Sequence, residues 1–137
     1  MVSAEPRRLR RVIDLCGGSG HLTRTIVESG AEAPVLADAF FWKVWLARHF
    51  VAPSCEPVCC DGNSPLPFTS SVFSMVILSD AFPYIWHKRM LADELTRVAG
   101  PEAFVVMPHL HSPLAFNYSA GMTLTPAAYA DLLADLK

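Results

Sequence analysis

Three aspartates in this chain each follow a short apolar segment, in a pattern that suits a nucleotide-like ligand. Asp14 precedes a glycine-rich turn at 16–20, where the backbone can turn sharply and a ligand can approach without meeting a Cβ. A carboxylate there suits a cation, such as the ammonium of an amino acid. Asp38, one strand–helix–strand unit later, can bind both hydroxyls of a ribose. Asp61 can accept a hydrogen bond from an exocyclic amine such as that of adenine.

Each of these features also has a purely structural interpretation. The glycine turn can be a tight connection between a strand and a helix. Asp38 can be the N-cap of the helix that follows it. Asp61, followed by Gly62, can form an Asx-turn.

Three histidines are candidates for proton transfer. His87 follows the fourth apolar run, and His109 and His111 follow the fifth. The last two are two positions apart, so we expect their side chains on one face. Histidine titrates near neutral pH and can act as a general base. Alternatively, His87 is a surface residue and the pair is half of a metal site. No third ligand stands at a convincing spacing, so we expect no metal.

Short apolar runs alternate along the chain with segments of helical periodicity. Strands are expected at 12–15, 34–37, 57–60, 72–79 and 103–107, and helices at 21–29, 39–50, 86–99 and 125–136. This alternation predicts an α/β fold, a Rossmann-like three-layer sandwich whose mostly parallel sheet has helices on both faces. Ligands of such sheets bind outside the carboxyl ends of the strands, where the strand order switches, and each candidate residue lies at such an end.

The composition indicates one globular domain over residues 1–137, with 1–10 as a lead-in. Of the 137 residues, 52% are apolar and 18% are charged, and the net charge of −2 argues against nucleic acid as a partner. The arginines at 7, 8, 10 and 11 are interpreted as a solvated lead-in rather than a phosphate or RNA contact.

The cysteines and the apolar segments bear on location. The four cysteines show no paired CxxC spacing, so we expect reduced thiols rather than a zinc site. No apolar segment is long enough to span a membrane, and the N-terminus lacks the apolar region of a signal peptide. We therefore expect no membrane association and a cytoplasmic location.

Taken in order, these segments resemble the class I S-adenosylmethionine-dependent methyltransferases, and most closely the broad group that acts on small molecules. The resemblance covers roughly residues 11–108. It rests on Asp14-Leu15-Cys16-Gly17-Gly18-Ser19-Gly20, Asp38, Asp61, Leu66-Pro67-Phe68, Val72-Phe73-Ser74-Met75-Val76 and Glu94-Leu95-Thr96-Arg97-Val98-Ala99-Gly100-Pro101. It implies S-adenosylmethionine as the cofactor, a small-molecule acceptor and a methyl-transfer activity.

The resemblance also implies roles for the candidate residues. Asp14 would hold the methionine part of the cofactor together with Cys16, Gly17, Gly18, Ser19 and Gly20. Asp38, with Ala39 beside it, would hold the ribose. Asp61 and the N–H of Gly62 would frame the adenine, and Ser79 would lie beside the sulfonium. His109, His111 and His87 stand where the methyl acceptor would bind.

The sequence departs from the family pattern at several points. Cys16 replaces the usual first glycine, which is tolerable if that position has an ordinary φ. Ser74 replaces a common aspartate, and Glu102 replaces a glycine. Five strands are expected where the family usually has seven, so we expect a sheet truncated at five strands. The edge of the fifth strand would then be covered by a partner chain or by further C-terminal sequence.

Three functions compete. The first is a small-molecule methyltransferase. The second is a nicotinamide-binding dehydrogenase domain, which would need a third glycine of GxGxxG that this turn lacks and would give Asp61 no role. The third is a non-catalytic methyltransferase-like domain that serves for binding or structure within a larger assembly. The three carboxylates argue against an inert copy.

Overall fold

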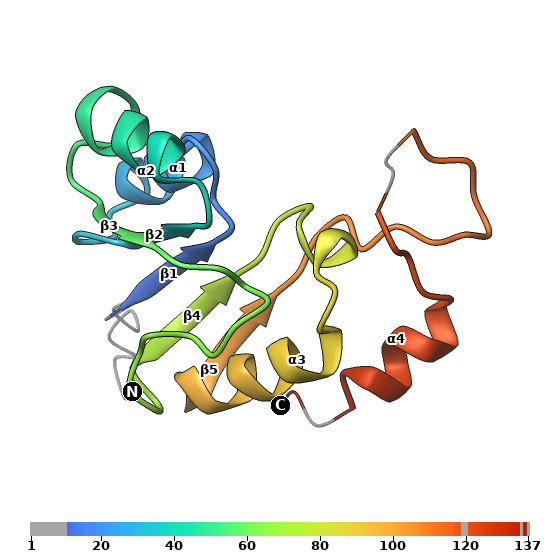
Figure 1. The fold of residues 1–137 in the computed structure, drawn as a ribbon. Coiled ribbons are helices and arrows are strands. Elements are labelled where there is room, and N and C mark those ends of the chain that lie inside the picture. The colour runs from blue at the N-terminus through green and yellow to red at the C-terminus, as the bar shows by residue number, and fades with distance from the viewer. Residues whose placement is uncertain (1–10, 119–120, 135, 137) are drawn as a thin grey trace, which may run out of the picture.

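A computed structural model describes residues 11–118, 121–134 and 136, so the expected lead-in at 1–10 lies outside the described residues (Figure 1). Five strands alternate with helices along the chain. The strands are β1 (Val12–Leu15), β2 (Val35–Asp38), β3 (Glu56–Cys59), β4 (Phe73–Ile77) and β5 (Ala99–Val106). The α-helices are α1 (His21–Glu28), α2 (Phe41–Leu46), α3 (Lys88–Val98) and α4 (Pro126–Leu132), and a 3-10 turn spans Phe82–Tyr84.

The five strands form one sheet in the order β3-β2-β1-β4-β5, and every neighbouring pair is parallel. The chain begins in the middle of the sheet at β1, extends it to β3 on one side, and returns to add β4 and β5 on the other. The switch in strand order therefore lies between β1 and β4. Because all strands are parallel, their carboxyl ends share one edge of the sheet, and the loops that follow β1 to β5 meet there.

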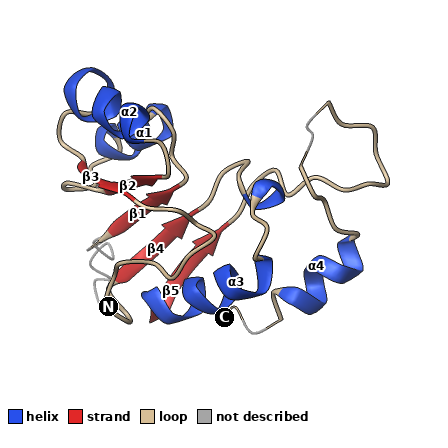
Figure 2. Ribbon diagram, viewed as in Figure 1, coloured by secondary structure: helices blue, strands red, loops and turns tan. Residues whose placement is uncertain are grey.

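Helices cover both faces of the sheet, as the sequence predicts (Figure 2). Right-handed connections that run in opposite directions from the centre place α1 and α2 on one face and α3 on the other. The side chains of β2 alternate accordingly. Leu36 packs with Val44 and Ala47 of the α2 face, whereas Val35 and Ala37 join the larger cluster beneath α3.

Several element boundaries differ from the expected ones for local reasons. The helix expected at 39–50 is α2 followed by a π-helical turn at Ala47–Val51. The helix expected from Trp86 begins at Lys88, because the side-chain carbonyl of Asn63 accepts the main-chain N–H groups of Trp86 and His87 at 2.7 and 3.3 Å.

The fifth strand begins earlier than expected. Ala99 already pairs with Phe73, and the ladder then shifts register before Phe104 pairs with Met75. Gly100 belongs to this irregular stretch, and a Cβ there would come within 3.3 Å of the Phe73 carbonyl oxygen.

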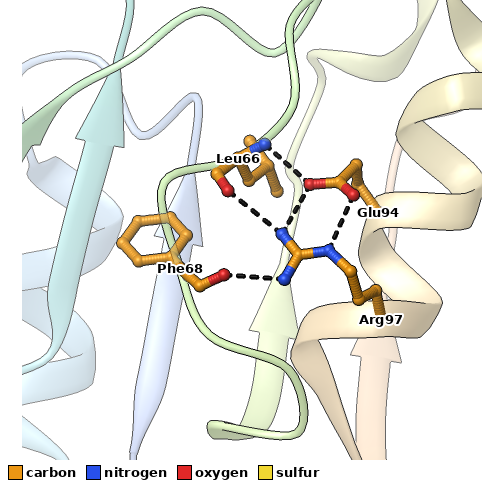
Figure 3. A network of polar contacts seen from close by, with 4 residues as sticks. All are labelled: Leu66, Phe68, Glu94 and Arg97. Atoms are coloured by element: carbon orange, nitrogen blue, oxygen red, sulfur yellow. Dashed lines mark hydrogen bonds and ion pairs between the residues drawn. The ribbon is translucent and has the colours of Figure 1, made fainter.

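A bidentate ion pair on α3 fixes the long connection between β3 and β4 (Figure 3). Arg97 binds both carboxylate oxygens of Glu94, through Nε at 2.7 Å and Nη2 at 2.6 Å. The same guanidinium donates to the carbonyls of Leu66 and Phe68, and Glu94 accepts the N–H of Leu66 at 2.7 Å. The Glu94–Arg97 element of the family pattern therefore holds the Leu66–Phe68 element in place.

The two edge strands differ in length and composition. β3 has four largely exposed residues, among them Cys59 and Pro57, and Pro57 cannot donate a main-chain hydrogen bond. β5 has eight residues and carries the exposed apolar side chains of Phe104 and Val106. Among the described helices, none has the length and apolar character needed to cross a membrane.

Candidate functional site

The glycine turn after β1 is shaped by close backbone approaches. A Cβ on Gly17 would lie 2.7 Å from the carboxylate of Asp14, and a Cβ on Gly20 would lie 2.8 Å from Cβ of Ala47. Gly20 precedes α1 with a φ of 83°, a conformation that glycine adopts readily. Glycine at these two positions lets the turn lie directly against β1 and lets α1 pack against the π-helical turn.

Cys16 does not have the ordinary φ that would make it a neutral replacement for glycine. Its φ is 58°, in the left-handed region, which costs a non-glycine residue about 1 kcal/mol or more. Its Sγ faces Gly62, where a Cβ would come within 3.6 Å of it. The side chain thus joins the turn after β1 to the turn after β3.

Asp14 is almost fully buried beneath the glycine turn, with 1% of its surface exposed. Its Oδ2 accepts a 2.6 Å hydrogen bond from the hydroxyl of Thr23 on α1. Burial raises the pKa of this carboxyl to about 6, hydrogen bonds from the hydroxyl and the main-chain N–H of Thr23 oppose that rise, and the neighbouring Asp38 adds to it. A buried acid without a cationic partner is costly, and a bound cation would relieve the cost.

Asp38 links the turns after β1 and β2. Its Oδ2 accepts the N–H of Gly18 at 3.0 Å, and its Oδ1 accepts the N–H of Phe40 at 2.9 Å. The N-cap residue of α2 is Phe40, with no side-chain cap, so Asp38 does not cap this helix in the expected way. Each oxygen retains a second lone pair that can accept a further hydrogen bond.

Asp61 forms the expected Asx-turn and remains exposed. Its Oδ1 accepts both the main-chain N–H and the side-chain amide of Asn63, at 2.9 and 3.0 Å. Its Oδ2 has no hydrogen-bond partner in the described part of the chain. The neighbouring Gly62 is buried and packs close to Ile85 and Cys16.

The three acids gather around the Cys16 thiol. Burial raises the pKa of Cys16 to about 12. Electrostatic repulsion from the nearby Asp38, Cys60, Asp14 and Asp61 adds to the rise, in decreasing order. Burial likewise raises the pKa of Cys60 to about 11, helped by Cys59, Asp61 and Asp38. Both thiols are therefore neutral at physiological pH, and the negative charge of this region belongs to the carboxylates.

Two predicted cofactor residues make few contacts. Ser19 is half-buried within the glycine turn, and Ala39 is exposed, its carbonyl accepting a weak 3.5 Å hydrogen bond from the Cys59 thiol. The structure therefore brings together most of the predicted cofactor residues, namely Asp14, Cys16, Gly17, Gly18, Gly20, Asp38, Asp61 and Gly62.

The second half of the site lies after β4 and β5. Ser79 is half-buried just beyond β4, and Asp80 follows it. His111 Nε2 lies 2.6 Å from Asp80 Oδ1, and the rings of His111 and His109 stack with their centroids 6.5 Å apart. The expectation that the two histidines share a face is confirmed.

His87 lies elsewhere, at the N-cap of α3, where it is exposed and where its N–H donates to Asn63. Within the described residues, no contact joins it to His109 or His111. In the same part of the chain, no group of three or more His, Cys, Asp or Glu side chains is arranged to hold a metal ion.

Three residues that shape the site are not among those predicted from the sequence: Thr23, which holds Asp14; Asn63, which joins the Asp61 turn to the start of α3; and Asp80, which binds His111. Asp80 could have been predicted from the sequence, because it follows Ser79 directly at the end of an apolar strand. The partners of Thr23 and Asn63 depend on contacts that only the folded chain shows.

Comparison of the sequence with protein-family models and with curated proteins finds no match. Solved structures are similar. A Haloferax volcanii chain from a complex with the Trm112 methyltransferase activator superimposes with a TM-score of 0.83 at 19% identity, over 93% of this chain. This chain spans 61% of that chain's length.

Two further structures agree. A SAM-dependent methyltransferase from Aquifex aeolicus has a TM-score of 0.75 at 16% identity, over 92% of this chain and 70% of its own. A TehB-like SAM-dependent methyltransferase from Corynebacterium glutamicum has a TM-score of 0.73 at 13% identity, over 97% and 67%. With its parallel five-stranded sheet and its glycine turn after β1, the chain has the fold of the class I S-adenosylmethionine-dependent methyltransferases.

Proposed function

We propose that this chain binds S-adenosylmethionine at the carboxyl ends of β1 to β3 and transfers its methyl group to a small-molecule acceptor. The observation that carries the proposal is the gathering of Asp14, Asp38 and Asp61 around the turn that begins at Cys16. A ligand with an ammonium, a ribose and an adenine offers a partner to each of these acids.

The residues fit this cofactor in charge and in shape. Asp14 supplies a buried negative charge for the ammonium of the methionine part, because its only hydrogen-bond partner among the described residues, Thr23, is neutral. Asp38 has lone pairs left for the ribose hydroxyls, and its hydrogen bond to Gly18 holds the turn against it. Asp61 offers its unpaired Oδ2 to the adenine amine, beside the N–H of Gly62.

When bound, the cofactor would supply a methyl group on a sulfonium. The acceptor would attack the methyl carbon in line with the C–S bond, with the sulfur as the leaving group. The chain has to align the acceptor and, where necessary, remove a proton from it. We assign the acceptor to the region after β4 and β5, where Ser79, His109 and His111 lie. His87, on the Asn63 side, is the weaker candidate for a catalytic role.

Titration calorimetry with S-adenosylhomocysteine tests the cofactor assignment. The parent protein should bind this ligand, and Asp38→Asn should bind it at least ~10-fold more weakly, because a charge-assisted hydrogen bond is worth roughly 1.5–3 kcal/mol. Asp93→Asn, which removes an exposed acid on α3, is the matched control and should bind as the parent does. Stabilisation of the protein by NAD and not by S-adenosylhomocysteine would show that the proposal is wrong.

A protein partner at β5 is the second part of the proposal. β5 is an edge strand with Phe104 and Val106 exposed, and such an edge readily pairs with another chain. The similar Haloferax chain comes from a complex with the Trm112 methyltransferase activator, which supports a protein partner for this chain. Light scattering should detect self-association of these 137 residues alone, and Phe104→Lys should reduce it. A parent chain that stays monomeric at high concentration would contradict this part.

A further inference from the structure

The loops that follow β4 and β5 are joined by a close polar contact that the cofactor assignment does not use. His111 Nε2 lies 2.6 Å from Asp80 Oδ1. The side chain of His111 is 26% exposed and that of Asp80 is 57% exposed, so a small molecule can reach the pair. Asp80 directly follows Ser79, the residue expected beside the sulfonium.

The backbone on both sides of this contact is held in place. The N–H of Asp80 donates to the carbonyl of Pro108 at 3.2 Å, which ties the loop after β4 to the loop after β5. The hydroxyl of Tyr129 on α4 donates to the carbonyl of Leu110 at 2.7 Å. The pair is therefore anchored from the sheet and from α4.

Three residues here have left-handed backbone conformations. The φ values of Asp80, His109 and His111 are 52°, 60° and 55°. Non-glycine residues adopt this conformation at a cost, and such strain persists where the surroundings enforce it, often at functional sites. The strain and the anchors together present the His111 ring to Asp80.

The contact determines which nitrogen of His111 carries the proton. An ionised carboxylate only accepts hydrogen bonds, so in the neutral ring Nε2 carries the hydrogen and Nδ1 has the free lone pair. Nδ1 has no hydrogen-bond partner in the described part of the chain. His111 is thus prepared to accept a proton at Nδ1, and the resulting imidazolium would be paired with Asp80.

We propose that Asp80 and His111 form a proton-accepting dyad and that the methyl acceptor is a hydroxyl compound. This inference rests on the proposed methyl transfer. As the hydroxyl oxygen gains the methyl group, its proton passes to Nδ1 of His111, and the sulfur keeps the electron pair of the broken C–S bond. An ionised acid has no proton to lose and an amine can attack with its own lone pair, so a hydroxyl has the greatest need of the dyad.

The first test determines, in the ligand-free protein, which nitrogen of the His111 ring carries the hydrogen. Nitrogen-15 spectra of the histidine rings should show His111 with the hydrogen on Nε2. His49 is an internal reference of the opposite kind, because its Nδ1 lies 2.8 Å from the carbonyl oxygen of Trp45 and must donate to it. Asp80→Asn should abolish the preference of His111 and leave His49 unchanged, and Asp80→Glu should restore it. A His111 ring that Asp80→Asn does not affect would overturn the dyad.

The second test identifies the acceptor class and the proton acceptor. The protein is incubated with S-adenosylmethionine carrying a deuterated methyl group and a mixture of small phenols, alcohols, amines and carboxylic acids, and products are found by mass spectrometry. We expect label on hydroxyl oxygens only. His111→Gln should lower this product at least ~10-fold at neutral pH and recover it as the pH rises, because hydroxide then removes the proton. A residue with only a structural role would not produce that recovery.

The outcomes separate this inference from the proposed function. Binding of S-adenosylhomocysteine that is unchanged in Asp80→Asn, with the product lost, supports both. Label on amines or carboxylates alone, or full product from His111→Gln at neutral pH, overturns the dyad and leaves the methyl transfer intact. Failure of the parent to bind S-adenosylhomocysteine removes the proposed function itself, while the ring spectra still decide whether the Asp80–His111 contact exists.

Discussion

Two carboxylates in this protein, Asp14 in the glycine-turn region and Glu94 on α3, have opposite surroundings and opposite shifts in pKa. Glu94 receives two bonds from Arg97 and one from Leu66, and these hold its pKa below the ordinary value despite partial burial. Asp14 is more deeply buried and accepts hydrogen bonds only from the neutral Thr23 among the described residues, so burial raises its pKa to about 6. The first arrangement stabilises the fold, and the second weakens it.

The difference separates architecture from binding. Nothing in the Glu94 network is left for a ligand, since its partners satisfy the acid and fix the 66–68 connection (Figure 3). Asp14 retains a charge for which the described residues provide no cationic partner. Proteins keep such unfavourable groups where a ligand compensates for them, so the comparison itself points to the β1 end of the sheet as the binding region.

The largest effect is expected from Arg97→Ala. This change removes the guanidinium that donates to Glu94 and to the carbonyls of Leu66 and Phe68. Loss of a charged donor to several partly buried groups should lower the free energy of unfolding by about 3 kcal/mol. Arg89→Ala on the same helix is the control, because Arg89 is exposed and, within the described residues, makes one 3.4 Å bond, to the Leu132 carbonyl. Equal losses in urea denaturation would mean that the network does not stabilise the fold.

The next largest effect is expected from Asp14→Asn, and it is a gain in the free energy of unfolding rather than a loss. The folded pKa of Asp14, about 6, exceeds its ordinary value of 3.8, so the folded state binds the extra proton and stability falls as pH rises through that window. The shift corresponds to about 3 kcal/mol at neutral pH. Asp14→Asn removes most of this penalty and should stabilise the ligand-free protein by about 2 kcal/mol at pH 7.

The same variant should lose affinity for S-adenosylhomocysteine, because the charge offered to the ammonium is gone. Melting curves across pH provide the check, and the stabilisation should vanish below about pH 4, where Asp14 is protonated in both states. Stabilisation that is independent of pH would point to packing rather than charge. A variant that is destabilised at pH 7 would show that Asp14 is an ordinary structural acid.

The sequence predicted the elements of this fold better than the contacts between them. Apolar periodicity and turn residues located the strands and helices to within a few positions, and the glycines located the turn beneath which Asp14 is buried. Exceptions arose where a side chain from elsewhere binds the backbone, as Asn63 does before α3. A local pattern cannot encode a partner that only the folded chain brings near.

Backbone conformation was the second feature that could not be predicted from the sequence. The sequence pattern marks Cys16 only as a departure from glycine, and its left-handed φ comes from the turn that surrounds it. Asp80 was missed for a related reason, because its partner His111 belongs to another loop and both residues have unusual φ values. The acids at the strand ends were predictable because parallel topology alone brings them to one edge.

The smallest effect in this comparison is expected from Glu94→Gln, which keeps the shape of the side chain and removes its charge. Because the folded pKa of Glu94 is lowered, its contribution is complete above the ordinary pKa of 4.5 and is lost as pH falls through the folded value. We expect a loss of about 1 kcal/mol at pH 7, since the amide can still accept one bond but places its N–H₂ group against another donor. The loss should shrink in acid, so the pH slope of stability is opposite to that of Asp14. If both variants responded to pH with the same sign, the contrast between a satisfied structural acid and an unsatisfied binding acid would fail.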